Sequence, residues 1–253
     1  MKVLIIGDIF GKTGRKVVKN YLTEAKEVDL VIANVENTTH GKGISLKHYE
    51  ELKRMGINVM TSGNHIFYLE ETRKKINELS ILLRPANFNP YHPGQGSMVI
   101  KCKEKRIRIT NLIGQAFMPH ADNPYFIFEK FLEEKDYDIH LVDFHAEASA
   151  EKNVFAWYFD GKITALWGTH THVQTADERI LPKGTAFITD VGMTGPQHGI
   201  IGAQPQAIIQ RSKYGFSAKM LPSEDNGKFN GIILEINEIS NQVISIKRIN
   251  INY

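Results

Sequence analysis

The chain of 253 residues contains a single cysteine, Cys102. An intrachain disulfide is therefore excluded, and the sequence is compatible with a reducing compartment. A lone cysteine without an adjacent activating pattern is typical of a small packing residue more than of a nucleophile.

Long apolar runs and a strong charge of one sign are also absent. No stretch approaches the length of a membrane span, and the apolar run 2–6 is too short for a signal peptide, so we expect a cytoplasmic protein without a membrane partner. The formal net charge is only +3, which gives no strong nucleic-acid signature. The most basic segment, 101–108, is interpreted as the solvated face of a hairpin. A homo-oligomer is compatible with the sequence.

Apolar runs alternate with amphipathic segments over the first third of the chain. This βαβαβα rhythm predicts parallel strands that are covered by helices. Ser45 is the expected N-cap of the second helix. The predicted strands are 2–7, 29–35 and 57–61, and the predicted helices are 14–26, 45–55 and 69–79.

The rest of the chain has several strands for each helix. This ratio predicts a two-sheet α/β sandwich with an α+β tendency instead of a purely doubly wound sheet. No repeat or linker interrupts the pattern, so we expect one domain over 1–253. The predicted elements are a hairpin of 97–102 with 106–113, a helix at 123–134, strands at 139–144, 163–167 and 186–189, and a hairpin of 231–236 with 243–251.

Five short polar clusters follow five of the apolar runs. Each lies where a strand would end, and ligands bind at such edges in α/β sheets. Together they supply carboxylate, amide and imidazole groups, a mixed set suited to divalent transition metals. The clusters are Gly7-Asp8, Glu36-Asn37, Gly63-Asn64-His65, Asp143-Phe144-His145 and Gly168-Thr169-His170-Thr171-His172.

The first cluster opens a stretch, 7–13, that invites a phosphate-loop interpretation. A P-loop needs four residues between its glycines, and only three separate Gly7 from Gly11. Asp8 is better explained as a metal ligand, with a structural turn aspartate as the alternative.

The second cluster places Glu36 at the end of a buried strand. A carboxylate in that position is costly unless it is paired or metal-bound, and its two oxygens can bridge two cations. Capping of a helix by Asn37 is the competing interpretation.

The third cluster pairs a neutral ligand with a histidine. The side-chain oxygen of Asn64 can bind a metal while His65 faces the substrate. The alternative is a turn with an exposed histidine.

The fourth cluster ends in His145, again at a strand end. His140 on the same strand is assigned no role. Glu147 and Glu151 are expected to cap or charge the first turn of the next helix.

The fifth cluster carries the strongest local signal. In an extended conformation His170 and His172 project to the same side, so both can approach one dinuclear cluster. Two solvated loop histidines are the weaker alternative.

At these residues the chain resembles the calcineurin-like metallophosphoesterases, most closely the bacterial YmdB-like 2′,3′-cyclic-nucleotide 2′-phosphodiesterases. The resemblance runs from residue 1 to beyond 200. Two departures from the wider superfamily are shared with this branch: Phe10 replaces a histidine of the first block, and Glu36 replaces a bridging aspartate. Further matching stretches are Arg84-Pro85-Ala86-Asn87, 143–147, 169–182 and 189–196.

The resemblance implies a four-layer αββα sandwich of two mixed sheets flanked by helices, and it implies two metal ions, with iron expected and manganese or zinc as alternatives. It also places Arg84, Asn87 and the loop 192–194 near the substrate. One metal would be held by Asp8, Glu36, Asn37 and His172, and the other by Glu36, Asn64, His145 and His170.

The implied activity is hydrolysis of a small phosphoester, most closely a 2′,3′-cyclic nucleotide opened to a 3′-nucleotide. A hydroxide bridging the metals would attack phosphorus in line. His65 is the candidate catalytic residue, which would stabilise the phosphorane or protonate the leaving oxygen. Two alternatives stay open: a phosphomonoesterase or phosphodiesterase on another substrate, and a non-catalytic RNA-associated regulator that keeps the fold.

Overall fold

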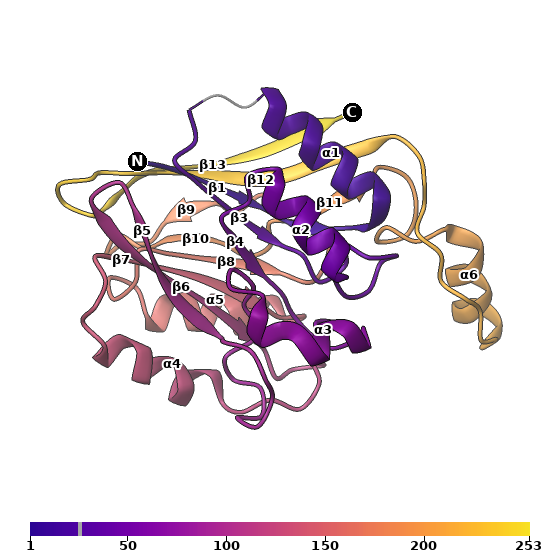
Figure 1. Ribbon diagram of the computed structural model, residues 1–253, viewed down its shortest axis with the longest axis horizontal. Helices are drawn as coiled ribbons and strands as arrows, with labels where there is room; N and C mark the ends of the chain where they lie inside the picture. Colours follow the sequence, from indigo (N-terminus) through magenta and orange to yellow (C-terminus); the bar gives the residue numbers. More distant parts are fainter. Residues whose placement is uncertain (25–26) are drawn as a thin grey trace.

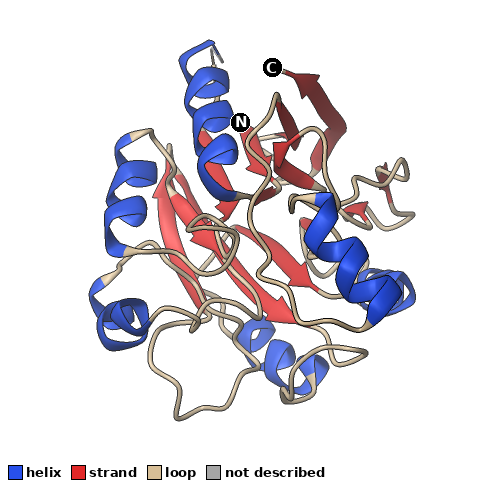
Figure 2. Cartoon of the chain, turned by 90° about the vertical axis from the view of Figure 1, so that its right-hand side faces the viewer, coloured by secondary structure: helices blue, strands red, loops and turns tan. Residues whose placement is uncertain are grey.

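The computed structural model describes residues 1–24 and 27–253. Two β-sheets pack face to face, and helices cover the outer face of each (Figure 1). Figure 2 shows the strands in the interior with the helices around them. The predicted four-layer αββα sandwich is therefore confirmed.

The first sheet has the order β2-β11-β12-β1-β3-β4, and β13 pairs with β12. Its strands β1, β3 and β4 are parallel neighbours, as the βαβαβα rhythm predicted, and β12 pairs with β13 in the predicted antiparallel hairpin. The strands are β1 (Lys2–Ile6), β2 (Asp8–Ile9), β3 (Leu30–Asn34), β4 (Val59–Thr61), β11 (Met193–Pro196), β12 (Gly227–Ile236) and β13 (Val243–Asn252).

The second sheet has the order β5-β6-β7-β8-β10-β9. Its four central strands run parallel, and an antiparallel strand lies at each edge. The strands are β5 (Ser97–Cys102), β6 (Lys105–Ile113), β7 (Ile139–His145), β8 (Ala165–Thr169), β9 (Arg179–Ile180) and β10 (Ala186–Ile188).

The helices largely follow the prediction. Ser45 caps α2 as expected, because its side chain accepts a hydrogen bond from the His48 amide. The first helix begins at Gly11 instead of residue 14, and the predicted residues 25 and 26 lie outside the described residues. Helix α6, which no prediction covered, projects from the sandwich, and none of its residues is buried. The helices are α1 (Gly11–Glu24), α2 (Leu46–Arg54), α3 (Glu70–Lys75) with a 3₁₀ turn (Ile76–Glu78), α4 (Pro124–Glu133), α5 (Ser149–Tyr158) and α6 (Pro205–Tyr214).

Successive side chains of the central strands pack into two different hydrophobic cores. In β1, Val3 and Ile5 pack between the sheets with Trp167 of the second sheet. Leu4 and Ile6 point the other way, into the core beneath α1 and α2. Because successive side chains of a strand face opposite sides, a continuous apolar run serves both cores at once.

The basic segment 101–108 does form the predicted hairpin of β5 and β6, but it is not solvated throughout. Arg108 is 4% exposed, and its guanidinium donates to Glu134 and, at 2.6 Å, to Asp136. The interpretation as a solvated face is therefore wrong at this residue. Within 1–24 and 27–253, the helices are all too short or too polar to cross a membrane.

Candidate metal centre

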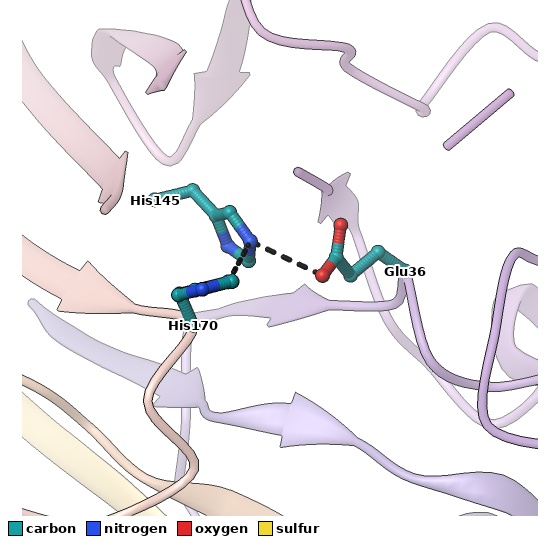
Figure 3. Close-up of side chains that lie close together, drawn as sticks. All are labelled: Glu36, His145 and His170. Carbon is teal, nitrogen blue, oxygen red and sulfur yellow. Dashed lines mark hydrogen bonds and ion pairs between the residues drawn. The ribbon is translucent and has the colours of Figure 1, made fainter. Parts of the chain in front are cut away.

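Strand ends from both sheets meet at one edge of the sandwich. Glu36 follows β3 and Asn64 follows β4 in the first sheet, whereas His145 ends β7 and His170 follows β8 in the second. The carboxyl ends of parallel strands share one edge of a sheet, so the two sheets bring their polar clusters to the same place. Figure 3 shows Glu36, His145 and His170 pointing toward one another.

The first group of side chains centres on His145. Its Nε2 atom lies 3.1 Å from Oε1 of Glu36 and 3.1 Å from Nδ1 of His170 (Figure 3). The same atom lies 3.0 Å from Oδ1 of Asn64. One ligand atom each from Glu36, His145 and His170 lies within 4.8 Å of the others, a grouping that could hold a metal ion.

A second group lies beside the first. Nε2 of His172 is 3.3 Å from Oδ1 of Asn37 and 3.9 Å from Oδ1 of Asp8. The two groups are linked, because the amide of His170 donates to Oδ2 of Asp8 at 3.2 Å. The structure thus brings together all seven residues for which a ligand role was expected.

The donor set fits metal ions. Asp8 is fully buried, and among the described residues its Oδ1 atom has no hydrogen-bond partner. A buried carboxylate oxygen without a partner is costly unless a cation satisfies it. Carboxylate, amide and imidazole groups together suit Fe, Mn or Zn.

Burial and neighbouring charges shift the pKa values of the centre in opposite directions. Burial raises the pKa of Asp8. Burial would also raise the pKa of Glu36, but His145 and His65 outweigh it and hold the value well below the usual range. Burial would lower the pKa of His145, yet the Glu36 carboxylate raises it to about 9. In the metal-free protein a proton on His145 therefore offsets the charge of Glu36, a role that a bound cation takes over.

A buried relay orients His145. Its Nδ1 atom lies 2.9 Å from Oγ1 of Thr169, and that hydroxyl donates to Oδ1 of Asp143 at 2.7 Å. Since the hydroxyl proton is used on Asp143, Nδ1 of His145 carries a hydrogen, and Nε2 is the atom that faces Glu36 and would bind a metal once it has lost its own proton. Such outer hydrogen bonds fix the tautomer of metal-binding histidines. No pattern in the sequence predicts that β7 and β8 are neighbours, which this relay requires.

Glu147 has a different role from the expected one. Its Oε2 atom lies 3.1 Å from Nε2 of His170, which leaves Nδ1 of His170 to face His145. The expectation that Glu147 serves the next helix is therefore wrong. Glu151 does lie in the first turn of α5, as expected, and it also accepts from the Gln115 amide.

The backbone at the fifth cluster is not extended. His170 has a φ of 101° and His172 a φ of 65°, both in the left-handed region that non-glycine residues rarely adopt. The prediction that an extended segment aims both rings was wrong, although both rings reach the centre. Backbone strain of this kind persists only where the surroundings hold it in place.

His65 lies at the exposed side of the centre. Its amide donates to Oε2 of Glu36 at 2.9 Å, and its Nδ1 atom lies 3.2 Å from Oε1 of the same carboxylate. A quarter of its side chain is exposed, whereas Glu36 is buried. This placement leaves the imidazole open to a substrate.

Three further side-chain contacts are made to the backbone of loops, by Asn37, Arg84 and Asn87. Asn37 donates to the carbonyl of Gly41 and lies within the turn 36–41, so the alternative of a helix cap is wrong. Arg84 donates to the carbonyls of Pro85 and Pro93, and Asn87 donates to those of Ile113 and Asp122. The side chains of Arg84 and Asn87 therefore hold loops instead of facing the centre.

Comparison with known proteins identifies the family. The model of the family described as "YmdB-like protein" matches residues 4–249. The chain is 41% identical to the 2′,3′-cyclic-nucleotide 2′-phosphodiesterase of Bacillus subtilis, over 100% of this chain and 97% of that protein.

Two solved structures share the whole fold. A structure described as a novel phosphatase, from Mycoplasma pneumoniae, superposes with a TM-score of 0.94 at 42% identity, covering 100% of this chain and 93% of that chain. A hypothetical protein of Thermus thermophilus superposes with a TM-score of 0.93 at 33% identity, covering 100% and 99%. The chain belongs to the YmdB-like protein family, and its two-sheet sandwich is of the metallophosphoesterase type.

Proposed function

We propose that the protein is a dinuclear-metal phosphodiesterase that opens 2′,3′-cyclic nucleotides to 3′-nucleotides. The observation that carries the proposal is the convergence of buried Glu36, buried His145 and partly exposed His170 at one point. The class of reaction, hydrolysis of a phosphoric ester, is supported by membership of the family and by the 41% identity to the Bacillus subtilis enzyme.

Two metal sites share one carboxylate in this proposal. Glu36 would contribute to both sites, and Asp8 connects the two groups because its Oδ2 also accepts from the amide of His170. When bound, two metal ions lower the pKa of a water molecule and offset charge on the phosphate. Asp8, Glu36, Asn37 and His172 would hold one ion, and Glu36, Asn64, His145 and His170 would hold the other, with iron expected and manganese or zinc as alternatives.

His65 completes the chemistry. Water attacks phosphorus in line with the 2′ oxygen, the bond between phosphorus and that oxygen breaks, and the oxygen takes up a proton. His65 is placed to deliver that proton, or to donate to the phosphorane oxygens, because it is partly exposed and its ring is oriented by Glu36. The product keeps its phosphate on the 3′ oxygen.

A phosphomonoesterase is the second candidate, because the Mycoplasma pneumoniae structure is described as a phosphatase. The same metal-binding core can serve several phosphoesters. A non-catalytic regulator is the third candidate, but such a protein has no need of the buried, orphaned Oδ1 of Asp8.

One experiment separates these candidates. Protein loaded with Mn²⁺ or, without oxygen, with Fe²⁺ is given 2′,3′-cyclic AMP, 3′,5′-cyclic AMP and AMP, and the products are identified by chromatography. We expect 3′-AMP from the first substrate alone. Release of phosphate from AMP would support the second candidate, and absence of any product with both metals would support the third.

A further inference from the structure

A buried ion pair lies directly behind the metal centre. Nζ of Lys152, on α5, lies 2.7 Å from Oδ2 of Asp190, on the segment between β10 and β11, and both side chains are fully buried. Taking two charges out of water is costly, and apolar residues in place of such a pair are often neutral or stabilising. The presence of this pair therefore calls for a reason other than stability.

The pair holds the backbone on both sides of His170. Lys152 donates to the carbonyl of Thr169 at 2.9 Å, and the amide of Thr171 donates to Oδ2 of Asp190 at 3.1 Å. His170 lies between these two anchored residues with its φ of 101°. The pair thus supplies the surroundings that keep a strained metal-centre histidine in place.

The same aspartate also fixes Asp8. Oδ1 of Asp190 accepts from the amide of Gly192 at 2.8 Å, and the carbonyl of Gly192 accepts from the amide of Asp8 at 3.0 Å. Asp8 belongs to the first sheet and His170 follows a strand of the second. Asp190 is therefore connected to metal-centre residues of both sheets.

Close packing leaves these segments little freedom. A Cβ atom on Gly168 would lie 1.9 Å from the carbonyl oxygen of Thr189 and 2.6 Å from Cδ of Lys152. A Cβ atom on Gly7 would lie 1.9 Å from the carbonyl oxygen of Gly192. The glycines that precede Asp8 and His170 let both strands approach the segment that carries Asp190.

We propose that Lys152 and Asp190 are positioning residues that set the separation of Asp8 and His170 for metal binding. The inference rests on the proposed metal centre. Hydrogen bonds that orient ligands from outside raise metal affinity by holding the ligands at the required distance.

The test compares Lys152→Met with Arg108→Met. Both variants remove a buried cation and keep an apolar stem. Arg108 is the control because it lies on β6 five residues along the strand from Ile113, the residue that pairs with His145 of the metal centre. Binding of Mn²⁺ to metal-free protein is measured by calorimetry, and unfolding of the metal-free protein is followed by circular dichroism. We expect Lys152→Met to weaken Mn²⁺ binding by about 10- to 100-fold while it stays folded. Arg108→Met should bind Mn²⁺ as wild type does, whatever its stability.

A merely structural pair would lower the unfolding midpoint and leave the affinity for Mn²⁺ unchanged. Lys152→Met with wild-type affinity would therefore overturn the positioning role. If that variant does not fold, the double variant Lys152→Met/Asp190→Leu leaves no unpaired charge, and wild-type affinity in it would overturn the proposal equally. Wild-type protein that binds no Mn²⁺ and no Fe²⁺ would instead overturn the metal centre itself.

Discussion

Nε2 of His145 lies 3.1 Å from Oε1 of Glu36, and the contact joins the ends of strands from different sheets. Neither group reaches water, since both side chains are at most 1% exposed. Their opposite charges stabilise each other in the metal-free protein. When metal is bound, the carboxylate and the imidazole would instead both serve as ligands.

Glu36→Gln should abolish the bridge between the two metal sites. The amide keeps the size of the side chain but loses its charge, so we expect metal affinity to fall by at least about 100-fold, beyond the usual loss from an outer partner. Metal content after dialysis against Mn²⁺ gives the measurement. A variant that retains two ions per chain would contradict the bridging role.

Thr169→Val should weaken metal binding through His145. The substitution removes the hydroxyl between His145 and Asp143 while keeping the shape, and we expect an affinity for Mn²⁺ lower by about 10- to 100-fold. Thr110→Val is the matched control, because Thr110 is equally buried and its hydroxyl lies 2.9 Å from Nε2 of His140. Equal affinities in the two variants, measured by calorimetry, would rule out the relay.

His65→Ala should separate catalysis from metal binding. The backbone amide that donates to Glu36 remains, so metal content should stay close to that of wild type. Turnover of 2′,3′-cyclic AMP should fall by about 10²- to 10⁴-fold, the usual contribution of a general acid. Unchanged turnover would remove His65 from the mechanism, and loss of metal would reassign it as a ligand.

The sequence predicted the members of the centre because each cluster is continuous and directly follows an apolar run. Gly63-Asn64-His65 and Gly168-Thr169-His170 could be placed at strand ends without knowing which strands are neighbours. The common edge then follows from the parallel direction of the strands.

The partners behind the ligands could not be predicted in this way. Lys152 and Asp190 are 38 residues apart and lie on a helix and a loop, so no spacing relates them. The left-handed backbone of His170 depends on the same tertiary contacts. Helix α6 was missed for a different reason: it buries none of its residues, so the sequence carries no apolar stripe to reveal it.

His140 should make the protein sensitive to acid. Burial lowers the pKa of His140 to about 3, and Arg108 adds to the effect. His140 is therefore protonated near pH 6.5 in the unfolded chain, but only near pH 3 in the folded protein. Stability contributed by the neutral ring is complete above pH 6.5 and declines by up to about 1.4 kcal/mol per pH unit below it.

His140→Gln removes this titration, while its amide can still reach Thr110. Urea unfolding of both proteins in EDTA between pH 7 and 4 isolates the contribution as a difference in slope. We expect the variant to lose less stability on acidification than wild type. Parallel curves would show that His140 is protonated equally in the folded and unfolded states.

The most direct test of the dinuclear centre is anomalous diffraction from crystals of the protein loaded with Mn²⁺. We predict two peaks about 3.5–4 Å apart, with Glu36 between them, one beside Asp8, Asn37 and His172 and the other beside Asn64, His145 and His170. A single peak, or peaks away from Glu36, would contradict the account.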